Sequence, residues 1–341
     1  MKFGRVPTAQ AAGVISAHTI RAGSLIVKKG HRIGPEELRL LDEAGLPDLV
    51  AARLEPGDIG EDEAAARLAE RIAGAGLRRE APFTGRCNLV AETTGLLMVD
   101  RRCVDAINAV DEAITLATLA PFRPVAAGEM VATVKIIPYA VPGEAIARAC
   151  ASAPEPAIRI APYARQRVGV ISTMLPGLKP RTIEKTLRNL QHRLDPAGAA
   201  IVSELRVAHE SDAVSTALAR LTGTDGADLV VIFGASAIAD RRDVIPAGIE
   251  AAGGHVEHLG MPVDPGNLLL VGSLRDVPVI GAPGCARSPK ENGFDWVLQR
   301  ELAGLAVRRA DIVALGVGGL LTEIVSRPQP REGGTSADDD D

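Results

Sequence analysis

Two acids and two arginines crowd one short loop, the segment Asp240-Arg241-Arg242-Asp243. Carboxylate oxygens are hard ligands that suit Mg²⁺, which usually bridges to a phosphate. An arginine beside them would bind phosphate or pair with the acids. The spacing also allows a structural interpretation, in which Asp240 caps the following helix and the arginines are solvated. On the functional interpretation, Asp240 and Asp243 are the metal ligands.

This loop follows an apolar run typical of a strand, residues 227–234, which ends at Gly234. A glycine at a strand end lets the backbone approach a ligand closely, and N–H groups at the start of the next helix favour phosphate. A second apolar run, residues 277–282, ends in Pro283-Gly284 and another loop. Two such loops at one edge of a sheet predict a site for an anionic ligand and a metal.

The second half of the chain alternates strand and helix patterns, which predicts an α/β fold with three layers, α/β/α, around a mainly parallel sheet. Ligands bind such sheets at the carboxyl ends of the strands, so Thr173 and the loops 234–243 and 283–288 should share one crevice. We expect strands at 167–173, 199–207, 227–234, 255–261, 267–273 and 277–284, helices at 180–194, 211–221, 243–254 and 289–305, and an end to the fold at 310–316.

The first half, residues 1–155, is expected to be an α+β domain. Segments 27–33 and 125–141 predict strands with turns at Gly30 and Gly128. Helices are expected at 35–45, 61–77 and 100–119. Three prolines within 153–163 fit a linker or an edge strand, and the α/β domain should cover 163–327. The charged, glycine-containing tail 328–341 should be disordered.

Composition narrows the function classes. A net charge of −5 argues against nucleic acid as the main partner, and 2% aromatic residues argue against stacking platforms for single strands. The sequence contains no stretch of about 18 apolar residues that would span a membrane, and no signal-peptide core. The four cysteines lie far apart without a CxxC pattern, which argues against a zinc site. We therefore expect a cytoplasmic protein.

Several segments resemble the molybdopterin-binding family. RRDVIP at 241–246 resembles the Arg-Asp-Val-Thr-Pro motif of the molybdopterin adenylyltransferases, and PVIGAPG at 278–284 is similar to a strand and Pro-Gly loop shared with the molybdopterin molybdotransferases. The likeness spans about 167–320 and is greatest to divergent bacterial members. It implies the molybdopterin-binding fold and the pterin as ligand, with Mg²⁺ and ATP as candidate cofactors. Segments of the first half resemble small β-clip modules, which implies a role in oligomerisation.

The resemblance also implies site residues. The motif makes Asp243 the catalytic acid, acting on the pterin phosphate and metal. The sequence departs from the family at several positions: Ala235 replaces a loop glycine, Ser236-Ala237 replaces Thr-Gly, 172–175 replaces Thr-Gly-Asp-Glu, 285–288 replaces Asn-Pro, and His209 replaces one acid of a pair whose other member is Glu210. The implied cofactor-binding residues are Thr173, Glu210, Gly234, Ala235, Ser236, Asp240, Arg242, Pro265, Gly266, Pro283, Gly284, Cys285 and Ser288.

Cys285 follows Pro283-Gly284 in a loop that also contains arginine. A nearby cation would lower the pKa of its thiol, and a thiolate there would contact molybdenum or a dithiolene sulfur. The alternative is a small packed residue without a chemical role.

Three functions follow from these patterns. The first is an enzyme of molybdenum cofactor biosynthesis that carries out either Mg²⁺-dependent adenylylation or molybdate insertion. The second is a non-catalytic carrier that delivers the cofactor to molybdenum hydroxylases. The third is a sugar-acid dehydratase-like enzyme built on the first half. The expected partners are the pterin, a molybdenum enzyme or nucleotidyltransferase, and further copies of this chain.

Overall fold

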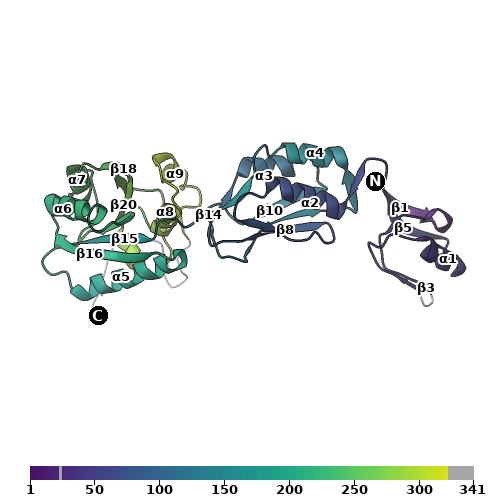
Figure 1. Ribbon diagram of the computed structural model, residues 1–341, viewed down its shortest axis with the longest axis horizontal. Helices are drawn as coiled ribbons and strands as arrows, with labels where there is room; N and C mark the ends of the chain where they lie inside the picture. Colours follow the sequence, from purple (N-terminus) through teal and green to yellow (C-terminus); the bar gives the residue numbers. More distant parts are fainter. Residues whose placement is uncertain (23–24, 322–341) are drawn as a thin grey trace, which may run out of the picture. The chain divides into compact units, whose positions relative to one another are not determined.

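The computed structural model describes residues 1–22 and 25–321, which fall into two compact units (Figure 1). The first unit is Met1–Pro162 and the second begins at Tyr163. The predicted tail 328–341, together with 322–327 of the predicted second domain, lies outside the described residues. None of the helices in the described ranges is long and apolar enough to cross a membrane.

The N-terminal part of the first unit contains two small antiparallel sheets and one helix. One sheet has the order β1 (Lys2–Pro7), β5 (Asp48–Arg53), β2 (Ile15–Ser16), and the other pairs β3 (Ile20–Ala22) with β4 (Leu25–Val27). Helix α1 (Pro35–Glu43) confirms the helix expected from residue 35. Its buried Leu41 packs with Val14, Ile33 and Leu49 in a core of their own.

The remainder of the first unit packs three helices on antiparallel strands. The helices are α2 (Glu61–Ile72), α3 (Arg101–Asn108) and α4 (Gly143–Ala151). The sheets have the orders β10-β12-β8-β7, β11-β9-β14 and β13-β6. The strands are β6 (Asp58–Gly60), β7 (Leu77–Arg79), β8 (Arg86–Ala91), β9 (Gly95–Val99), β10 (Ile114–Thr118), β11 (Pro124–Val125), β12 (Met130–Ile136), β13 (Ala140–Pro142) and β14 (Ile158–Pro162).

The single helix expected at 100–119 is wrong in its second half. Helix α3 ends at Asn108, whose side-chain amide both donates to the carbonyl of Leu116 (2.9 Å) and accepts from its N–H (2.8 Å). These bonds hold β10, which contains the β-branched Ile114 and Thr115, beside the helix. Branched side chains suit a pleated strand better than a helix. At the end of the unit, β14 is the last strand of its sheet, beside β9, and its Ile158 also forms an isolated bridge with Ala73.

The second unit is built on a six-stranded sheet with the order β16-β15-β17-β20-β19-β18. The first four strands in this order are parallel, and β19 runs antiparallel to both of its neighbours. The expected mainly parallel sheet is confirmed. The strands are β15 (Arg167–Met174), β16 (Ala200–Ala208), β17 (Leu229–Phe233), β18 (His255–Leu259), β19 (Leu270–Leu274) and β20 (Val277–Ala282).

Helices cover both faces of this sheet (Figure 1). Helices α5 (Pro180–Leu194) and α8 (Gly293–Leu302) share one core with the sheet. Helices α6 (Ser211–Thr222) and α7 (Val244–Ala251) share a separate core with its other face. The segment expected to end the fold contains a short helix, α9 (Arg309–Val313).

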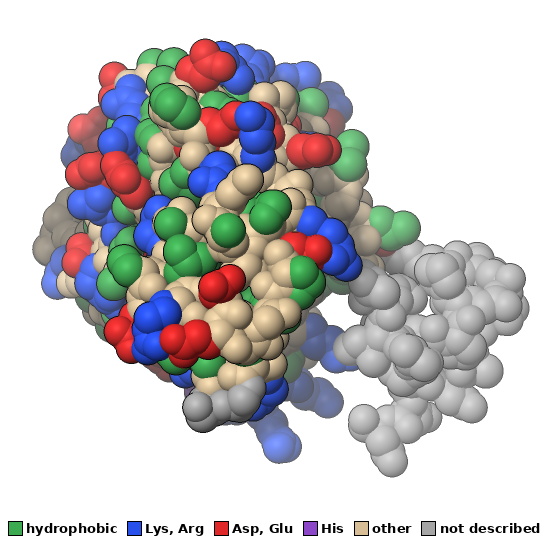
Figure 2. Space-filling model, turned by 90° about the vertical axis from the view of Figure 1, so that its right-hand side faces the viewer, with side chains coloured by type: hydrophobic (Ala, Val, Ile, Leu, Met, Phe, Trp, Pro, Cys, Tyr) green, Lys and Arg blue, Asp and Glu red, His purple; other side chains and the backbone are tan. Residues whose placement is uncertain are grey.

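The surface drawn in Figure 2 mixes charges of both signs. Acidic and basic side chains alternate over this face, and apolar side chains are scattered among them. Such a mixture is typical of an ordinary solvated surface.

The core between α5 and the sheet gives a first prediction. Leu190 is buried on α5, so Leu190→Ala should lower the free energy of unfolding of the second unit by about 2–5 kcal/mol, the range for cavity-forming substitutions. The protein has one tryptophan, Trp296, in the second unit, so its fluorescence during urea unfolding reports this unit. Leu268→Ala, at an exposed position of the same unit, is the control and should change stability by only about 0.5 kcal/mol. Equal losses in both variants would contradict the assignment of this core.

Candidate functional site

The register of the central strands brings their carboxyl ends together. Thr173 of β15 lies opposite Val207 of β16, and Phe233, the last residue of β17, lies opposite Ala282 of β20. The loops after these strands therefore start at one edge of the sheet, as expected from the alternation of strands and helices.

A hydrogen-bonded chain of three side chains crosses this edge. Thr173 is fully buried, and its Oγ1 lies 2.8 Å from Nδ1 of His209, the first residue after β16. The other ring nitrogen of His209, Nε2, lies 3.0 Å from Oγ of Ser236. Thr173 Oγ1 also accepts the backbone N–H of Ala235 at 2.8 Å. Thr173, Ala235 and Ser236 are thus brought together as predicted, but His209 was noted only as a replaced acid and not assigned to the site.

Gly234 is required by the loop itself. A Cβ at this position would lie 2.5 Å from the carbonyl oxygen of Ser236 and 2.9 Å from a methyl carbon of Ile245. Both distances are shorter than real contacts, so the tight turn between β17 and Ser236 depends on the missing side chain. This close packing within the protein accounts for the glycine without reference to a ligand.

Arg287 is a cation that the sequence patterns did not identify. Its guanidinium donates to the Gly234 carbonyl (2.9 Å) and to Thr186 Oγ1 (3.0 Å), and lies 5.4 Å from the centre of the Phe233 ring. Burial lowers the pKa of this guanidinium, and no carboxylate of the described residues forms an ion pair with it. The available signal was an arginine in a strand-end loop just after Pro283-Gly284.

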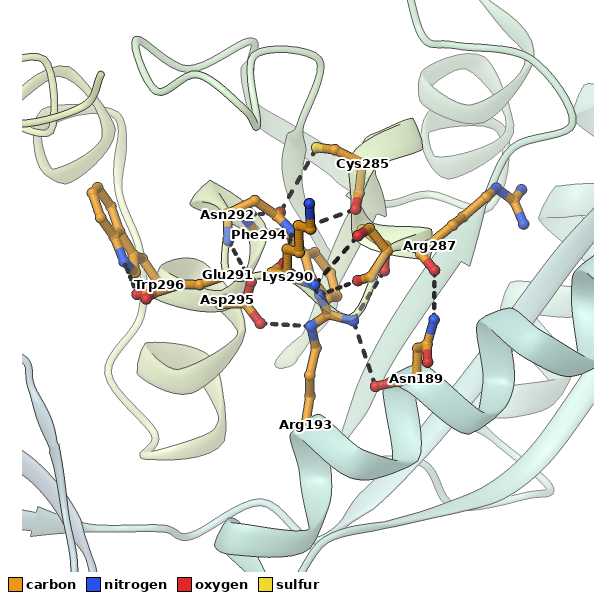
Figure 3. Close-up of polar contacts among 12 residues, drawn as sticks. Asn189, Arg193, Cys285, Arg287, Lys290, Glu291, Asn292, Phe294, Asp295 and Trp296 are labelled. Carbon is orange, nitrogen blue, oxygen red and sulfur yellow. Dashed lines mark hydrogen bonds and ion pairs between the residues drawn. The ribbon is translucent and has the colours of Figure 1, made fainter. Parts of the chain in front are cut away.

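A second arginine, Arg193 of α5, holds the loop in which Arg287 lies (Figure 3). Its Nε lies 2.5 Å from a carboxylate oxygen of Asp295, and both side chains are only 10–11% exposed. The same guanidinium donates to the carbonyls of Ala286 (3.1 Å), Ser288 (2.6 Å) and Lys290 (3.2 Å). Because these bonds come from one side chain, they fix the path of residues 286–290 against α5.

Asn189, one turn before Arg193, adds a further tie by donating to the Arg287 carbonyl at 2.6 Å. Beyond this loop, Asn292 accepts the N–H of Phe294, while the Asp295 carboxylate accepts the N–H of Asn292. This reciprocal pattern is a capping box that starts α8. Asp295 therefore both caps its own helix and forms an ion pair with Arg193.

The acidic loop has definite internal partners. Asp243, not Asp240, caps the following helix: its two carboxylate oxygens accept the N–H groups of Val244 (2.7 Å) and Ala239 (3.1 Å). Asp240 accepts the N–H and Nε of Arg242, which lowers the pKa of its carboxyl group. The Arg242 side chain is 91% exposed. The interpretation of Asp240 as the cap is therefore wrong, because the helix begins one residue after Asp243.

A metal ion at Asp240 and Asp243 stays a prediction. Among residues 1–22 and 25–321, no group of three or more histidine, cysteine, aspartate or glutamate side chains is arranged to hold a metal. A carboxylate has about four lone-pair positions, so the bonds that Asp243 accepts leave room for a cation. Glu210, which precedes α6, is exposed to solvent.

The two Pro-Gly segments differ in surroundings. Gly266 lies against the start of α8, where the Gly293 N–H donates to the Pro265 carbonyl at 2.9 Å. A Cβ at Gly266 would lie 3.0 Å from Gly293 Cα, and its φ of +142° also favours glycine. Gly284 is exposed, and a Cβ there would have no residue other than its chain neighbours within 4 Å. It begins the short 3₁₀ helix Gly284–Arg287 after the buried Pro283. Only the second segment therefore leaves space beside its glycine.

Of the two alternatives for Cys285, the first required a lowered thiol pKa, and the structure gives the opposite direction. Burial raises the pKa of its thiol, and Arg193 opposes this only weakly. The Sγ atom lies 3.7 Å from Oδ1 of Asn292, within the loop that Arg193 holds. This environment fits the alternative of a packed small residue, because a neutral thiol is the stable form there. Within this loop, the Ser288 carbonyl accepts a hydrogen bond from Arg193, and the Ser288 hydroxyl accepts one from the Lys290 N–H.

Comparison with known proteins gives structural matches only. No protein-family model and no curated protein matches the chain. Among solved structures, the molybdopterin biosynthesis MoeA protein of Pyrococcus horikosii is similar at 15% identity over 89% of this chain and 75% of its own, with a TM-score of 0.31. A molybdenum cofactor biosynthesis protein B is similar at 14% identity over 41% and 95%, with a TM-score of 0.31. The molybdopterin biosynthesis Mog protein of Mycobacterium ulcerans is similar at 16% identity over 42% and 100%, with a TM-score of 0.29. TM-scores of this size assign neither a fold nor a function to this chain.

The Arg193 contacts give a prediction about stability. Arg193→Met removes the partner of the buried Asp295 and leaves several carbonyls without a donor. Breaking a buried ion pair on one side costs about 3–5 kcal/mol, so the free energy of unfolding, followed by Trp296 fluorescence in urea, should fall by that amount. Arg188→Met, at an exposed position of the same helix, should change it by only about 0.5 kcal/mol. A small loss in Arg193→Met would show that this loop does not depend on the arginine.

Proposed function

We propose that the carboxyl edge of the central sheet binds the phosphate of molybdopterin and that the protein acts in molybdenum cofactor biosynthesis. The observation that carries this proposal is the half-buried Arg287 guanidinium, which has hydrogen-bond partners but no carboxylate partner among the described residues.

An unpaired cation in a partly desolvated position is unfavourable for the free protein. A bound anion would offset this, because a charge-assisted hydrogen bond to an arginine is stronger than a neutral one. Arg287 donates a hydrogen bond to the Gly234 carbonyl, and the loop that follows Gly234 contains the exposed Ser236. An anion at this edge would therefore meet a cation and a hydroxyl.

The choice of a pterin rests on sequence. RRDVIP and PVIGAPG, the segments that resemble the molybdopterin-binding family, flank this edge: Asp243 caps α7 and Pro283 follows β20. Asp240 and Asp243 would hold Mg²⁺, which would neutralise phosphate charge when bound. Arg242 and the loop residues Pro283 and Gly284 complete the proposed surroundings of the ligand.

Two modes of action fit the edge. As an enzyme, the protein would either join AMP from ATP to the ligand phosphate, with release of pyrophosphate, or insert molybdate. Asp243 within the retained Arg-Asp-Val-x-Pro pattern favours this mode. As a carrier, it would hold the finished cofactor for a molybdenum enzyme. The replacement of the loop glycine and Thr-Gly by Ala235, Ser236 and Ala237 favours the carrier.

The first experiment is incubation of purified protein with molybdopterin, Mg²⁺ and ATP, with and without molybdate. Retained pterin would be measured by fluorescence after oxidation, and products by mass spectrometry. An adenylylated or metallated product identifies the enzyme, and retained unchanged pterin identifies the carrier. Absence of retained pterin would contradict the proposed function.

The role of Arg287 is tested in the same assay. Arg287→Gln removes the charge, and we expect pterin affinity to fall by roughly 10- to 100-fold, since a hydrogen bond to a charged group is worth about 1.5–3 kcal/mol. Arg242→Gln tests the other arginine of the proposed site, and Arg220→Gln is the matched control, because Arg220 is exposed on α6 and already paired with Asp225. A larger loss in Arg242→Gln than in Arg287→Gln would move the anion site to the acidic loop.

Asp243→Asn separates the enzyme from the carrier. Asparagine is a good helix cap, so α7 should still form, with a loss of stability of about 1 kcal/mol because the Ala239 N–H then faces an amide. Product formation should be abolished in an enzyme, whereas a carrier should only bind the pterin more weakly. Undiminished turnover in Asp243→Asn would exclude a catalytic role for this carboxylate.

A further inference from the structure

We infer that Ser236 donates a hydrogen bond to an oxyanion of the ligand at the strand-end site, the carboxyl edge of the sheet where Thr173, His209, Ser236 and Arg287 lie. The buried Thr173 determines, through His209, that the Ser236 hydroxyl is a donor. The inference rests on the proposed function for the identity of the ligand only. Ser236, His209 and Thr173 resemble a nucleophile, a base and an orienting group in their spacing, so a second possibility is a serine nucleophile. The proton positions decide between the two.

Thr173 determines which atom donates in each hydrogen bond of the Thr173–His209–Ser236 series. A hydroxyl group carries one proton and can accept two hydrogen bonds. The Thr173 side chain is fully buried, so its proton needs an acceptor within the protein. Its polar partners among the described residues are the N–H of Ala235, which can only donate, and Nδ1 of His209. The proton is therefore given to Nδ1.

The proton that Thr173 donates determines the tautomer of the His209 imidazole. Because Nδ1 accepts, the neutral ring carries its proton on Nε2, which then donates to Ser236 Oγ over 3.0 Å. The other tautomer would present two donors to Thr173 Oγ1 and leave the buried hydroxyl proton without an acceptor. An unsatisfied buried donor is unfavourable enough that we expect the Nε2–H form to dominate by about tenfold or more.

The last bond determines what Ser236 offers. Its oxygen accepts from His209, and its own proton is left to point away from the ring, at an exposed position of the loop. A nucleophilic serine needs the opposite arrangement, with an unprotonated Nε2 that takes the hydroxyl proton. Ser236 therefore presents a donor, and the group bound beside it must be an acceptor such as a phosphate oxygen.

The tautomer is tested without any ligand. In protein labelled with ¹⁵N at the histidine rings, protonated and unprotonated nitrogens resonate far apart, and His209→Gln assigns the signals of His209 among the six histidines. At a pH where the ring is neutral, we expect a protonated Nε2 and an unprotonated Nδ1. Thr173→Val should shift the ring toward the other tautomer, whereas Thr173→Ser should restore the original signals. A protonated Nδ1 in the unaltered protein would overturn the inference.

The donor role is tested with inorganic phosphate as the probe. Ser236→Ala should weaken phosphate binding by roughly 3- to 10-fold, the effect of one lost hydrogen bond, and Ser236→Thr should preserve it. A fluorophosphonate, which labels activated serines, should leave Ser236 unmodified in mass spectrometry. Labelling of Ser236, or equal phosphate affinity in Ser236→Ala, would overturn the inference. Failure of the protein to retain molybdopterin, with these results as expected, would refute the proposed function and leave the inference standing.

Discussion

The buried contact of Arg193 with Asp295 determines how the strand-end site is built. The Arg193 guanidinium on α5 forms an ion pair with the carboxylate of Asp295 on α8. It also donates hydrogen bonds to three carbonyls of the loop between β20 and α8. The loop has little regular structure of its own beyond one short 3₁₀ helix. Its path therefore depends on a side chain that lies about ninety residues earlier in the sequence, and the position of Arg287 within the loop follows from it.

Arg193 and Arg287 differ in whether a carboxylate compensates the positive charge of the guanidinium. Arg193 has an acid and several carbonyls around it, which is the arrangement expected of a structural ion pair. Arg287 contacts a carbonyl, a hydroxyl and an aromatic face, none of which carries a full negative charge. The first holds the backbone in place, and the second brings uncompensated positive charge to the sheet edge. The proposed anion site needs both, because a cation binds a ligand best when the loop that carries it is held in one position.

The sequence predicted the second unit well because its elements have strong local signals. Apolar runs such as 229–233 can only be buried strands in this context, and alternation with helices predicts their parallel pairing. The helix expected at 100–119 was wrong because residues 114–118 form a strand that pairs with residues 132–136 of β12. The partners of Arg287 and the burial that raises the Cys285 pKa also depend on packing between distant segments. Spacing in the sequence carries no information on either.

The departures from the molybdopterin-binding motifs are physically connected. Thr173 lies where Thr-Gly-Asp-Glu is expected, His209 stands in for an acid, and Ser236 lies in the altered glycine loop. The structure joins these three residues in one hydrogen-bonded chain. Where the family motif has a carboxylate, the imidazole of His209 brings no negative charge to the edge that Arg287 approaches. These three residues therefore fill the motif positions with side chains that hydrogen-bond to one another, which changes the groups that a ligand at the proposed anion site would meet.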